Sequence, residues 1–354
     1  MNVDTQLLEK IQIKRATEVP ENTLIEFYQE MYPRRGEFLT KNWRWLYRID
    51  DFPQAKAPLV ALLDGKVIGH VAPIPIVLKS GSQEKFAAWG VDGGVLVPYR
   101  KSGIGFKLMQ IWARDYPIVL GFCTEALFRI LVKQGWSPRK TTYALQLLLR
   151  PGRHPRFQKG PLKAPLRLAG YGWSLLARLI IMARTEGWKK LRVAPLSAQR
   201  LENWSVLHHP WSFKDPLHVA RNLEFLKWRL LNSPFRKQYH ILEMEEADVA
   251  AVVRIFHQAG LRRAQVVAIS GNAPNRGALD RFLGGVVSWA VDQDVDLIKM
   301  ITSDPLVVRV AQRWLPKKAV QRFVGYCHDP KDQELIQSKN HIWELIDYDF
   351  DFIT

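Results

Sequence analysis

The sequence feature that most constrains the fold is a strand that runs directly into a glycine-containing turn and then into a helix. Residues 86–98 read FAAWGVDGGVLVP, residues 99–105 read YRKSGIG, and apolar spacing then predicts a helix from Gly103 to Arg114. The N–H groups of a first helical turn have no partner within the helix, and glycines let a ligand approach them closely. The passage therefore predicts a phosphate-binding turn in an α/β domain.

The elements around this turn predict a mixed sheet with helices on its faces. Before the turn, we expect strands at 12–16 and 58–79, the second being a hairpin around Asp64-Gly65, and helices at 23–32, capped by Asn22, and 38–47. After the turn, we expect a strand at 117–123, a helix at 124–134 and a strand at 141–149.

The same order of elements returns in the C-terminal part of the chain. Residues 225–231 (FLKWRLL) echo residues 38–46 (FLTKNWRWL), and hairpin, strand and helix patterns follow in the earlier order. The expected elements lie at 238–244, 250–256, 264–270, 278–291, 296–302, 304–314 and 319–327. We interpret this repetition as an ancestral duplication that produced two domains, 1–149 and 201–354, joined by a linker over 150–200.

The chain of 354 residues carries a formal charge of +17, and most of that excess lies in the linker. Between Arg150 and Arg192 there are eleven basic residues and one acid, Glu186. A Pro-rich basic segment precedes a predicted helix on which Trp173, Leu176, Leu179, Ile180 and Ala183 share a face. Two interpretations stay open: this face rests on an anionic membrane, or it packs between the domains while the arginines are solvated.

Composition excludes several classes of protein. Cys123 and Cys327 are the only cysteines, which excludes a disulfide scaffold and a cysteine-based zinc site. We expect no metal, because His208-His209 has no partners at ligand spacing. No uncharged run of 18 residues and no secretory signal are visible, so we expect a cytoplasmic protein. If the linker rests on a membrane, as in the first of the two interpretations, the contact is with its inner face.

The glycine turn resembles the acetyl-coenzyme A motif of the GNAT acyltransferase superfamily, in which a long strand ending in V-x-P leads into R/Q-x-x-G-x-G/A and a helix. Here the matching residues are Val95-Leu96-Val97-Pro98 and Arg100 to Gly105, and the segment 124–136 (TEALFRILVKQGW) is similar to the superfamily's penultimate helix. The resemblance implies an α/β, mixed-sheet fold of two GNAT-like domains, the second degenerate.

The resemblance also implies a binding site for acetyl-CoA. The pyrophosphate would be held by the backbone N–H groups of the turn and flanked by Arg100, and pantetheine would run along Leu96 and Val97. The thioester would lie near Gly94 and Val95, where Gly93 and Gly94 permit a bulge. The N–H donors would be those of Lys101, Ser102, Gly103, Ile104, Gly105 and Phe106.

Amine acylation requires a neutral amine, so a base is useful at pH 7. Asp92 is the first candidate, as base or amine-orienting group or in a structural role, and Glu125 is the second, unless it caps its helix. The superfamily's tyrosine general acid is absent, since its position is Leu131. Tyr143 or Cys123 could replace it, or no acid is needed because a thiolate leaves readily.

The second domain lacks the phosphate motif. Its corresponding loop, residues 270–277 (SGNAPNRG), is longer and contains a proline, and we read it as a non-binding copy. The ending HIWELIDYDFDF alternates like an edge strand. Its acids are expected to attract a cationic acceptor or to lie on an ordinary solvated face; they are Glu344, Asp347, Asp349 and Asp351.

The sequence thus predicts an acetyl-CoA-dependent N-acetyltransferase acting on an amine. The tandem organisation resembles bacterial proteins of polysaccharide synthesis, which would make the acceptor an amino sugar. One rival class is the tandem aminoacyl-tRNA-dependent peptidyltransferases, although a nucleic acid partner is not the expectation. The other rival is a CoA-binding protein without turnover.

Overall fold

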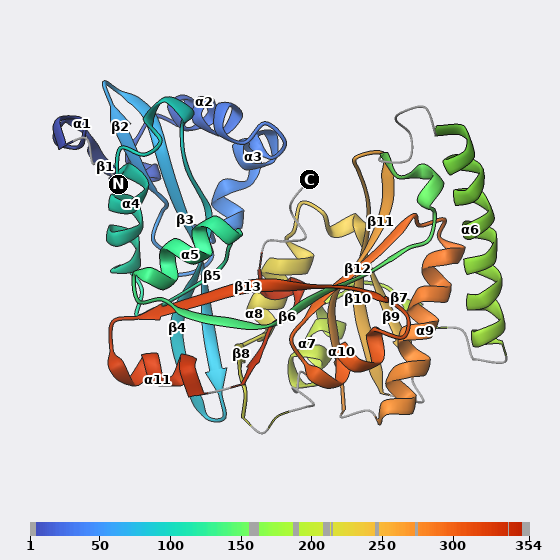
Figure 1. The fold of residues 1–354 in the computed structure, drawn as a ribbon. Coiled ribbons are helices and arrows are strands. Elements are labelled where there is room, and N and C mark those ends of the chain that lie inside the picture. Colours follow the sequence, from blue (N-terminus) through green and yellow to red (C-terminus); the bar gives the residue numbers. More distant parts are fainter. Residues whose placement is uncertain are drawn as a thin grey trace.

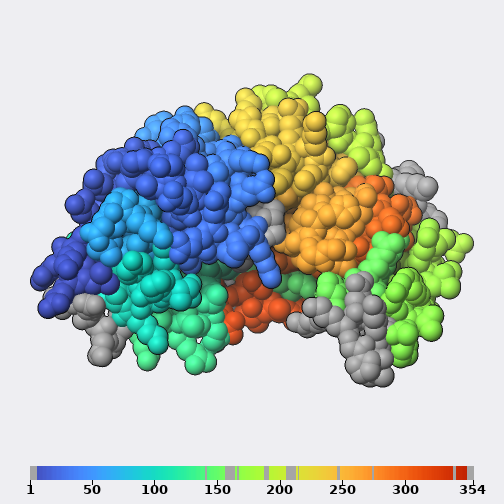
Figure 2. Space-filling model, turned by 90° about the horizontal axis from the view of Figure 1, so that it is seen from above, coloured from blue at the N-terminus to red at the C-terminus, as the bar shows by residue number. Residues whose placement is uncertain are grey.

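The structure, a computed structural model, describes residues 5–155, 163–186, 191–207, 213, 215–244, 248–272, 275–338 and 340–348. Its two halves lie side by side, the N-terminal half blue to green and the C-terminal half yellow to red (Figure 1). Seen from above, the blue and the yellow-orange halves form one body, and red C-terminal segments are visible between them (Figure 2).

The N-terminal half follows the predicted order of strands and helices. Its elements are α1 (Thr5–Lys10), β1 (Gln12–Arg15), α2 (Glu21–Met31), α3 (Gly36–Leu46), β2 (Leu59–Leu63), β3 (Lys66–Ser80), β4 (Gln83–Val95), the 3-10 turn η2 (Val97–Tyr99), α4 (Ile104–Ala113), β5 (Ile118–Phe122), α5 (Glu125–Lys133) and β6 (Ser137–Leu148). The hairpin between β2 and β3 turns at Asp64 and Gly65, with φ of 49° and 79°, as Asp-Gly predicts.

The C-terminal half repeats this order after a connecting segment. The connection contains η3 (Pro151–Arg153), α6 (Lys163–Thr185), β7 (Arg192–Ala194), α7 (Ala198–Leu207) and β8 (Leu217–Val219). The half itself contains α8 (Leu223–Leu226) with a π turn (Lys227–Leu231), β9 (Tyr239–Met244), β10 (Val249–Gln258), β11 (Leu261–Gly271), α9 (Arg276–Asp292), β12 (Leu297–Thr302), α10 (Pro305–Ala311), β13 (Lys317–Cys327), α11 (Pro330–Ser338), β14 (His341–Ile342) and η8 (Leu345–Asp347).

One predicted detail of the first half is wrong. We expected Asn22 to cap the helix that follows it, but α2 begins at Glu21, and the extended Pro20 precedes it. Asn22 therefore lies inside the first turn. The fixed φ of Pro20 places the chain at a helix entrance without a side-chain cap.

The two halves share a single sheet of 14 strands in the described part of the chain. Its main path runs β1-β2-β3-β4-β5-β13-β6-β12-β11-β10-β9-β7. Strand β13 of the second half pairs with β5 of the first, β6 of the first half pairs with β12 of the second, and β6 and β13 pair with each other. Each half therefore completes the sheet of the other. The boundaries 1–149, 150–200 and 201–354 stay predictions.

The two echoing tryptophan segments meet between the halves. The indole of Trp45 donates to the carbonyl of Trp228 at 3.3 Å, and the indole of Trp228 donates to the carbonyl of Trp45 at 2.8 Å. Reciprocal contacts of this kind are what a two-fold relation between equivalent segments produces. The main apolar core crosses the same junction and includes Trp89, Phe323 and Trp343, while a second core lies beneath α9.

The predicted linker helix is α6, and its orientation settles one of the two interpretations. The helix lies on the outer flank of the C-terminal half, against α9 (Figure 1). Trp173, Leu176, Leu179 and Ile180 do share a face, but that face is exposed. Packing of this face between the domains is therefore wrong, because the small residues on the opposite side, Gly170 and Ala177 among them, make the contact with the protein instead.

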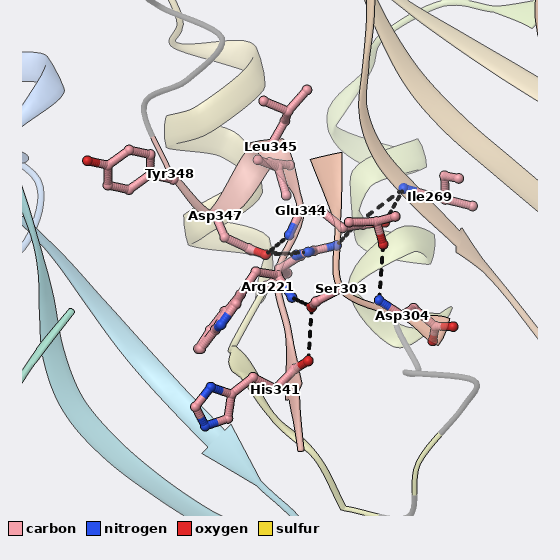
Figure 3. Close-up of polar contacts among 12 residues, drawn as sticks. Arg221, Ile269, Ser303, Asp304, His341, Glu344, Leu345, Asp347 and Tyr348 are labelled. Carbon is pink, nitrogen blue, oxygen red and sulfur yellow. Dashed lines mark hydrogen bonds and ion pairs between the residues drawn. The ribbon is translucent and has the colours of Figure 1, made fainter. Parts of the chain in front are cut away.

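The C-terminal segment 341–348 is buried, which corrects the expected edge strand with a solvated acidic face. The strand in this segment is limited to His341–Ile342, and Glu344 and Asp347 pair with the buried Arg221 (Figure 3). The Arg221–Glu344 contact measures 2.5 Å and the Arg221–Asp347 contact 2.6 Å. The alternating sequence led us to expect that these acids face solvent. The guanidinium that balances them lies more than 100 residues away in the chain, so local sequence does not reveal it. Asp349 and Asp351 lie outside the described residues.

Two carboxylates share one guanidinium in this cluster, so one negative charge is left over in a buried place. Burial raises the pKa of Glu344 to about 7, although Arg221 opposes the shift and the N–H of Ile269 also donates to the carboxylate. The protonated form of Glu344 is thus favoured in the folded protein compared with the unfolded chain.

We predict that Glu344 makes the protein less stable as pH rises from about 5 to 7. The folded state binds the Glu344 proton in a range where the unfolded chain has released it, so the free energy of unfolding falls with pH across that window. Urea titrations at pH 5.5 and 7.5 should show that Glu344→Gln removes this part of the pH dependence.

The comparison must be made as a difference between wild type and variant. Burial lowers the pKa values of His70 and His341 to about 4, and those groups add stability as pH rises. An unchanged pH dependence in Glu344→Gln would contradict the prediction.

Candidate functional site

The predicted phosphate turn connects β4 to α4 and leaves the start of the helix open. Gly103 occupies the position before the first helical residue with φ of 96°, and Lys101 also has a positive φ, 71°. A side chain at Gly103 would be strained in this conformation, so glycine is required there. No side chain forms a cap at Gly103.

Several N–H groups of this turn have no acceptor among the residues that the structure describes. In the described part of the chain, the N–H groups of Lys101, Gly105 and Phe106 have no hydrogen-bond acceptor, and that of Ile104 reaches only the hydroxyl of Ser102 at 3.4 Å. Arg100 and Lys101 are exposed beside them, and there is no carboxylate from residue 93 to residue 114. The positive end of the helix dipole adds to this charge.

At the equivalent helix of the second half, α9, a side chain caps the first turn. The side chain of Asn275 accepts the N–H of Ala278 at 2.8 Å at the start of α9. An asparagine cap satisfies the group that an anion would otherwise bind. Ala273 and Pro274, on which part of the predicted non-binding loop rests, lie outside the described residues.

Strands β4 and β5 separate beside the turn. They pair in parallel only from Ala87–Ile118 to Trp89–Leu120, and β4 then continues to Val95 without β5. The pairing of β4 with β3 shifts between Val91 and Gly94, and Asp92 has a φ of 48°. The predicted bulge is therefore present, and beside it the ladder between β4 and β5 has a gap beyond Trp89 and Leu120.

A buried polar network holds the bulge in place. The carbonyl of Asp92 accepts hydrogen bonds from Tyr32 and from Nδ1 of His70 at 2.9 Å. The carboxylate of Asp92 accepts from the hydroxyl of Tyr47 at 2.9 Å and lies 3.2 Å from a guanidinium nitrogen of Arg35. The side chains of Asp92 and Arg35 are both buried, so this is a desolvated ion pair.

His70 is neutral in this network, and its tautomer follows from its partners. A carbonyl only accepts, so Nδ1 carries the proton toward Asp92, and Nε2 accepts from the hydroxyl of Tyr28 at 3.2 Å. Burial lowers the pKa of His70 to about 4, against the pull of the Asp92 carbonyl. His70 therefore fixes the bulge and carries no charge near neutral pH.

Sequence reasoning missed Tyr32 and Arg35, which reach the bulge from the end of α2 and the start of α3. A Cβ placed on Gly94 would lie 3.2 Å from the hydroxyl of Tyr32 and 2.4 Å from Cε of Met31. The phenol of Tyr32 therefore borders the position predicted for the thioester. Burial and the nearby Asp92 raise the pKa of Tyr32, so its hydroxyl stays protonated.

The other predicted catalytic residues lie elsewhere. Glu125 is the first residue of α5 and pairs with Arg129 and Arg322, while Thr124 caps that helix. Tyr143 lies on β6, three strand spacings from β4, about 14 Å across the sheet. The structure does not bring Tyr143 to the bulge.

Tyr143 lines a different hollow of about 360 Å³ together with Arg139, Arg309 and Lys318. The ammonium group of Lys318 lies 3.8 Å from the centre of the Tyr143 ring. Three cations make this hollow unfavourable for an alkylammonium ion.

Neither the position of the missing general acid nor the nearby cysteine presents a free acid to solvent; Cys123 is half-buried. Leu131 is buried on α5. Cys123 follows β5, and burial raises the pKa of its thiol to about 12.

Tyr348, from the C-terminal segment, closes the base of the gap between β4 and β5. Its ring lies 5.1 Å from the ring of Trp89 and 5.2 Å from that of Phe122, and its hydroxyl donates to the carbonyl of Gly90 at 3.3 Å. Sequence spacing carries no sign of this contact. Across the described ranges, no group of three or more His, Cys, Asp or Glu side chains is arranged to hold a metal ion.

Comparison with solved structures relates this fold to known acyltransferases. A GCN5-related N-acetyltransferase from Kribbella flavida matches 94% of this chain and 74% of its own, with a TM-score of 0.56 and 13% identity. An N-myristoyltransferase from Saccharomyces cerevisiae with bound myristoyl-CoA matches 90% of this chain and 83% of its own, with a TM-score of 0.57 and 10% identity. The chain has the GNAT fold. No protein-family model and no curated protein match its sequence.

The GNAT fold agrees with the resemblance drawn from the glycine turn. A GCN5-related N-acetyltransferase from Anabaena variabilis also matches 90% of this chain and 73% of its own, with a TM-score of 0.52 and 12% identity. Likeness at this level of identity establishes the fold. The activity of this chain rests on its own site.

We predict that breaking the Asp92–Arg35 pair strongly destabilises the protein. Asp92→Ala leaves the Arg35 guanidinium buried beside a lost partner, which should lower the free energy of unfolding by about 3–5 kcal/mol. Urea denaturation measures the change.

Asp64→Ala is the matched control, because Asp64 has almost the same positive φ but lies in an exposed turn. It should cost only the left-handed strain of alanine, about 1–2 kcal/mol. Equal losses in the two variants would show that the buried pair contributes little.

Proposed function

We propose that this chain is an acyl-CoA-dependent N-acyltransferase that transfers an acetyl group from acetyl-CoA to an amine. The observation that carries the proposal is the open start of α4. Its unpartnered N–H groups, two flanking cations and a strand that parts from its neighbour occur together at one end of β4. Pyrophosphate and an extended pantetheine arm are the two chemical groups that such an arrangement suits.

In this proposal, coenzyme A supplies the thioester and the protein positions it. The backbone N–H groups from Lys101 to Phe106 bind the pyrophosphate, with Arg100 at its side. Pantetheine lies along Val95, Leu96 and Val97. The bulge at Asp92 turns the strand so that the thioester reaches the backbone at Gly94, beside Met31 and the hydroxyl of Tyr32.

The reaction itself requires little from the side chains. The lone pair of the neutral amine attacks the thioester carbon, the C–N bond forms, and the C–S bond breaks to release the thiolate. The proton leaves the amine for a base, and Asp92 is the candidate for base or amine-orienting group. Tyr32, which stays protonated, would turn its O–H from the Asp92 carbonyl to the departing sulfur. Glu125 is assigned no step because it pairs with Arg129 and Arg322. Tyr143 is assigned no step because it lies three strands away from β4.

The acceptor in this proposal is a small amine, and an amino sugar of bacterial polysaccharide synthesis is the specific candidate from sequence resemblance. The acyl group is proposed to be acetyl. Because one structural neighbour was solved with myristoyl-CoA, a panel from acetyl-CoA to myristoyl-CoA is the direct test of chain length.

The competing functions make different predictions for the same site. An aminoacyl-tRNA-dependent enzyme has no need of the open α4 turn, and it would bind RNA with a strong salt dependence. A CoA-binding protein without turnover would bind acetyl-CoA but acylate no amine. The open turn therefore favours an acyl-CoA-dependent acyltransferase or a CoA-binding protein over a tRNA-dependent enzyme.

We predict that Gly105→Glu abolishes acetyl-CoA binding. A Cβ at Gly105 meets only ordinary contact with Val95, so the fold tolerates it, but the carboxylate would face the phosphates. Calorimetry should show wild-type binding tighter than about 100 μM and none in the variant. Gln110→Glu is the control, since it adds the same charge to an exposed position of α4 and should leave binding unchanged.

Other results of this calorimetry would count against the proposal. If the wild-type protein fails to bind acetyl-CoA, both the acyltransferase function and the CoA-binding function are excluded. Salt-sensitive tRNA binding in that case would promote the RNA-dependent enzyme. Equal loss in Gln110→Glu and Gly105→Glu would show that the effect is general electrostatics.

We predict that Tyr32→Phe and Asp92→Asn each reduce turnover about 100-fold with little change in acetyl-CoA affinity. The two differ in pH dependence. The Asp92→Asn defect should shrink as pH approaches 10, where an alkyl amine loses its proton unaided, whereas the Tyr32→Phe defect should not. An unaltered rate and pH profile in Asp92→Asn would leave Asp92 with only its structural role.

A further inference from the structure

The most unusual surface of the molecule is the outward side of α6. Its large apolar side chains are between 45% and 72% exposed, namely Leu168, Tyr171, Trp173, Leu175, Leu176, Leu179, Ile180 and Met182. Figure 1 shows the helix on the outer flank of the C-terminal half, touched on one side by α9. A water-exposed helix ordinarily presents polar residues to solvent, so this pattern is inverted.

The inversion is specified by the packing of the helix. The inward positions are small or modest in size, including Gly170, Ser174, Ala177 and Ile181. A Cβ on Gly170 would lie 2.4 Å from the backbone nitrogen of Gly152, so only glycine allows this approach to η3. The helix is therefore held with its small side toward the protein and its large side outward.

The charges of the helix select an anionic partner. The described helix Lys163–Thr185 contains Lys163, Arg167, Arg178 and Arg184 and no acid. A second copy of the same face would bring these four like charges together, against the carboxylates of Glu186 and Asp292 beside the C-terminal end of the helix. An anionic lipid bilayer has an apolar interior and a negative surface, so it complements both the exposed apolar side of the helix and its positive charge.

We propose that α6 lies in the interfacial plane of an anionic lipid bilayer and docks the protein there. The helix is about 34 Å long, and its apolar side would enter the acyl boundary while the arginines meet the lipid phosphates. None of the described helices is both long and apolar enough to cross a membrane. Docking of this kind is peripheral, and it is independent of the proposed acyl transfer.

The test is co-sedimentation of the full chain with vesicles of phosphatidylcholine containing one quarter phosphatidylglycerol, and with pure phosphatidylcholine. Wild type should bind the anionic vesicles. Leu175→Glu with Leu179→Glu should reduce binding at least tenfold, and Arg178→Gln should reduce it about fivefold on anionic vesicles only. Circular dichroism melts establish that the variants stay folded, as exposed substitutions should.

Leu127→Glu with Ile130→Glu on α5 is the matched control. These aliphatic residues are 41% and 51% exposed, so the substitutions change charge and surface hydrophobicity equally at another place. The control pair should bind vesicles like wild type.

Three results would overturn the proposal. The first is that the wild type does not bind anionic vesicles. The second is that the variant with both Leu175→Glu and Leu179→Glu binds them as well as the wild type does. The third is that the wild type binds neutral and anionic vesicles with the same affinity. If the wild type instead forms a dimer by light scattering, and that variant makes it monomeric without any vesicle binding, α6 serves a second copy of the chain.

Discussion

The exchange of β6 and β13 is the constraint on which the rest of the structure depends. Strand β6 leaves the first half to pair with β12, and β13 leaves the second half to pair with β5, so β5 is flanked by β4 on one side and by β13 on the other. The gap between β4 and β5 is consequently backed by residues from the far end of the chain, Phe323 and Tyr348 among them. The candidate site belongs to both halves although its phosphate turn lies wholly in the first.

The two halves have the same architecture and opposite chemistry at the equivalent helix start. In α4, Gly103 offers no side chain, and the first N–H groups stay available to a ligand. In α9, Asn275 takes up the N–H of Ala278. One residue type at the position before the helix thus decides whether the turn can receive an anion. The second half retains the fold and the packing role without the open turn.

Features that depend on near neighbours could be predicted from the sequence. The Asp64-Gly65 hairpin, the bulge near Gly93 and the open turn at Gly103 are set by residues a few positions apart. Tyr32 and Arg35 could not be found this way, because they meet Asp92 from about 60 residues away. The expectation that the acids of the C-terminal segment face solvent was wrong for the same reason. Arg221, which is distant in sequence, pairs with them and allows their burial.

The linker helix shows a different limit. Helical spacing identified which apolar residues share a face, but period alone does not say whether that face points inward. The decision lies with Gly170 and Ala177, whose small size permits close packing on the other side. A search for small residues opposite a large apolar face would have identified the outward orientation.

The strand exchange also shapes how the chain is made. During synthesis β5 emerges early, but the strand that covers its outer edge ends at Cys327, about 200 residues later. At ribosomal rates of 5–20 residues per second, the exposed edge waits roughly 10–40 s for its partner. An unpaired strand edge is a template for aggregation, so the nascent first half needs shielding for that interval. The same pairing that unites the finished protein makes its first 150 residues dependent on the later synthesis of β13.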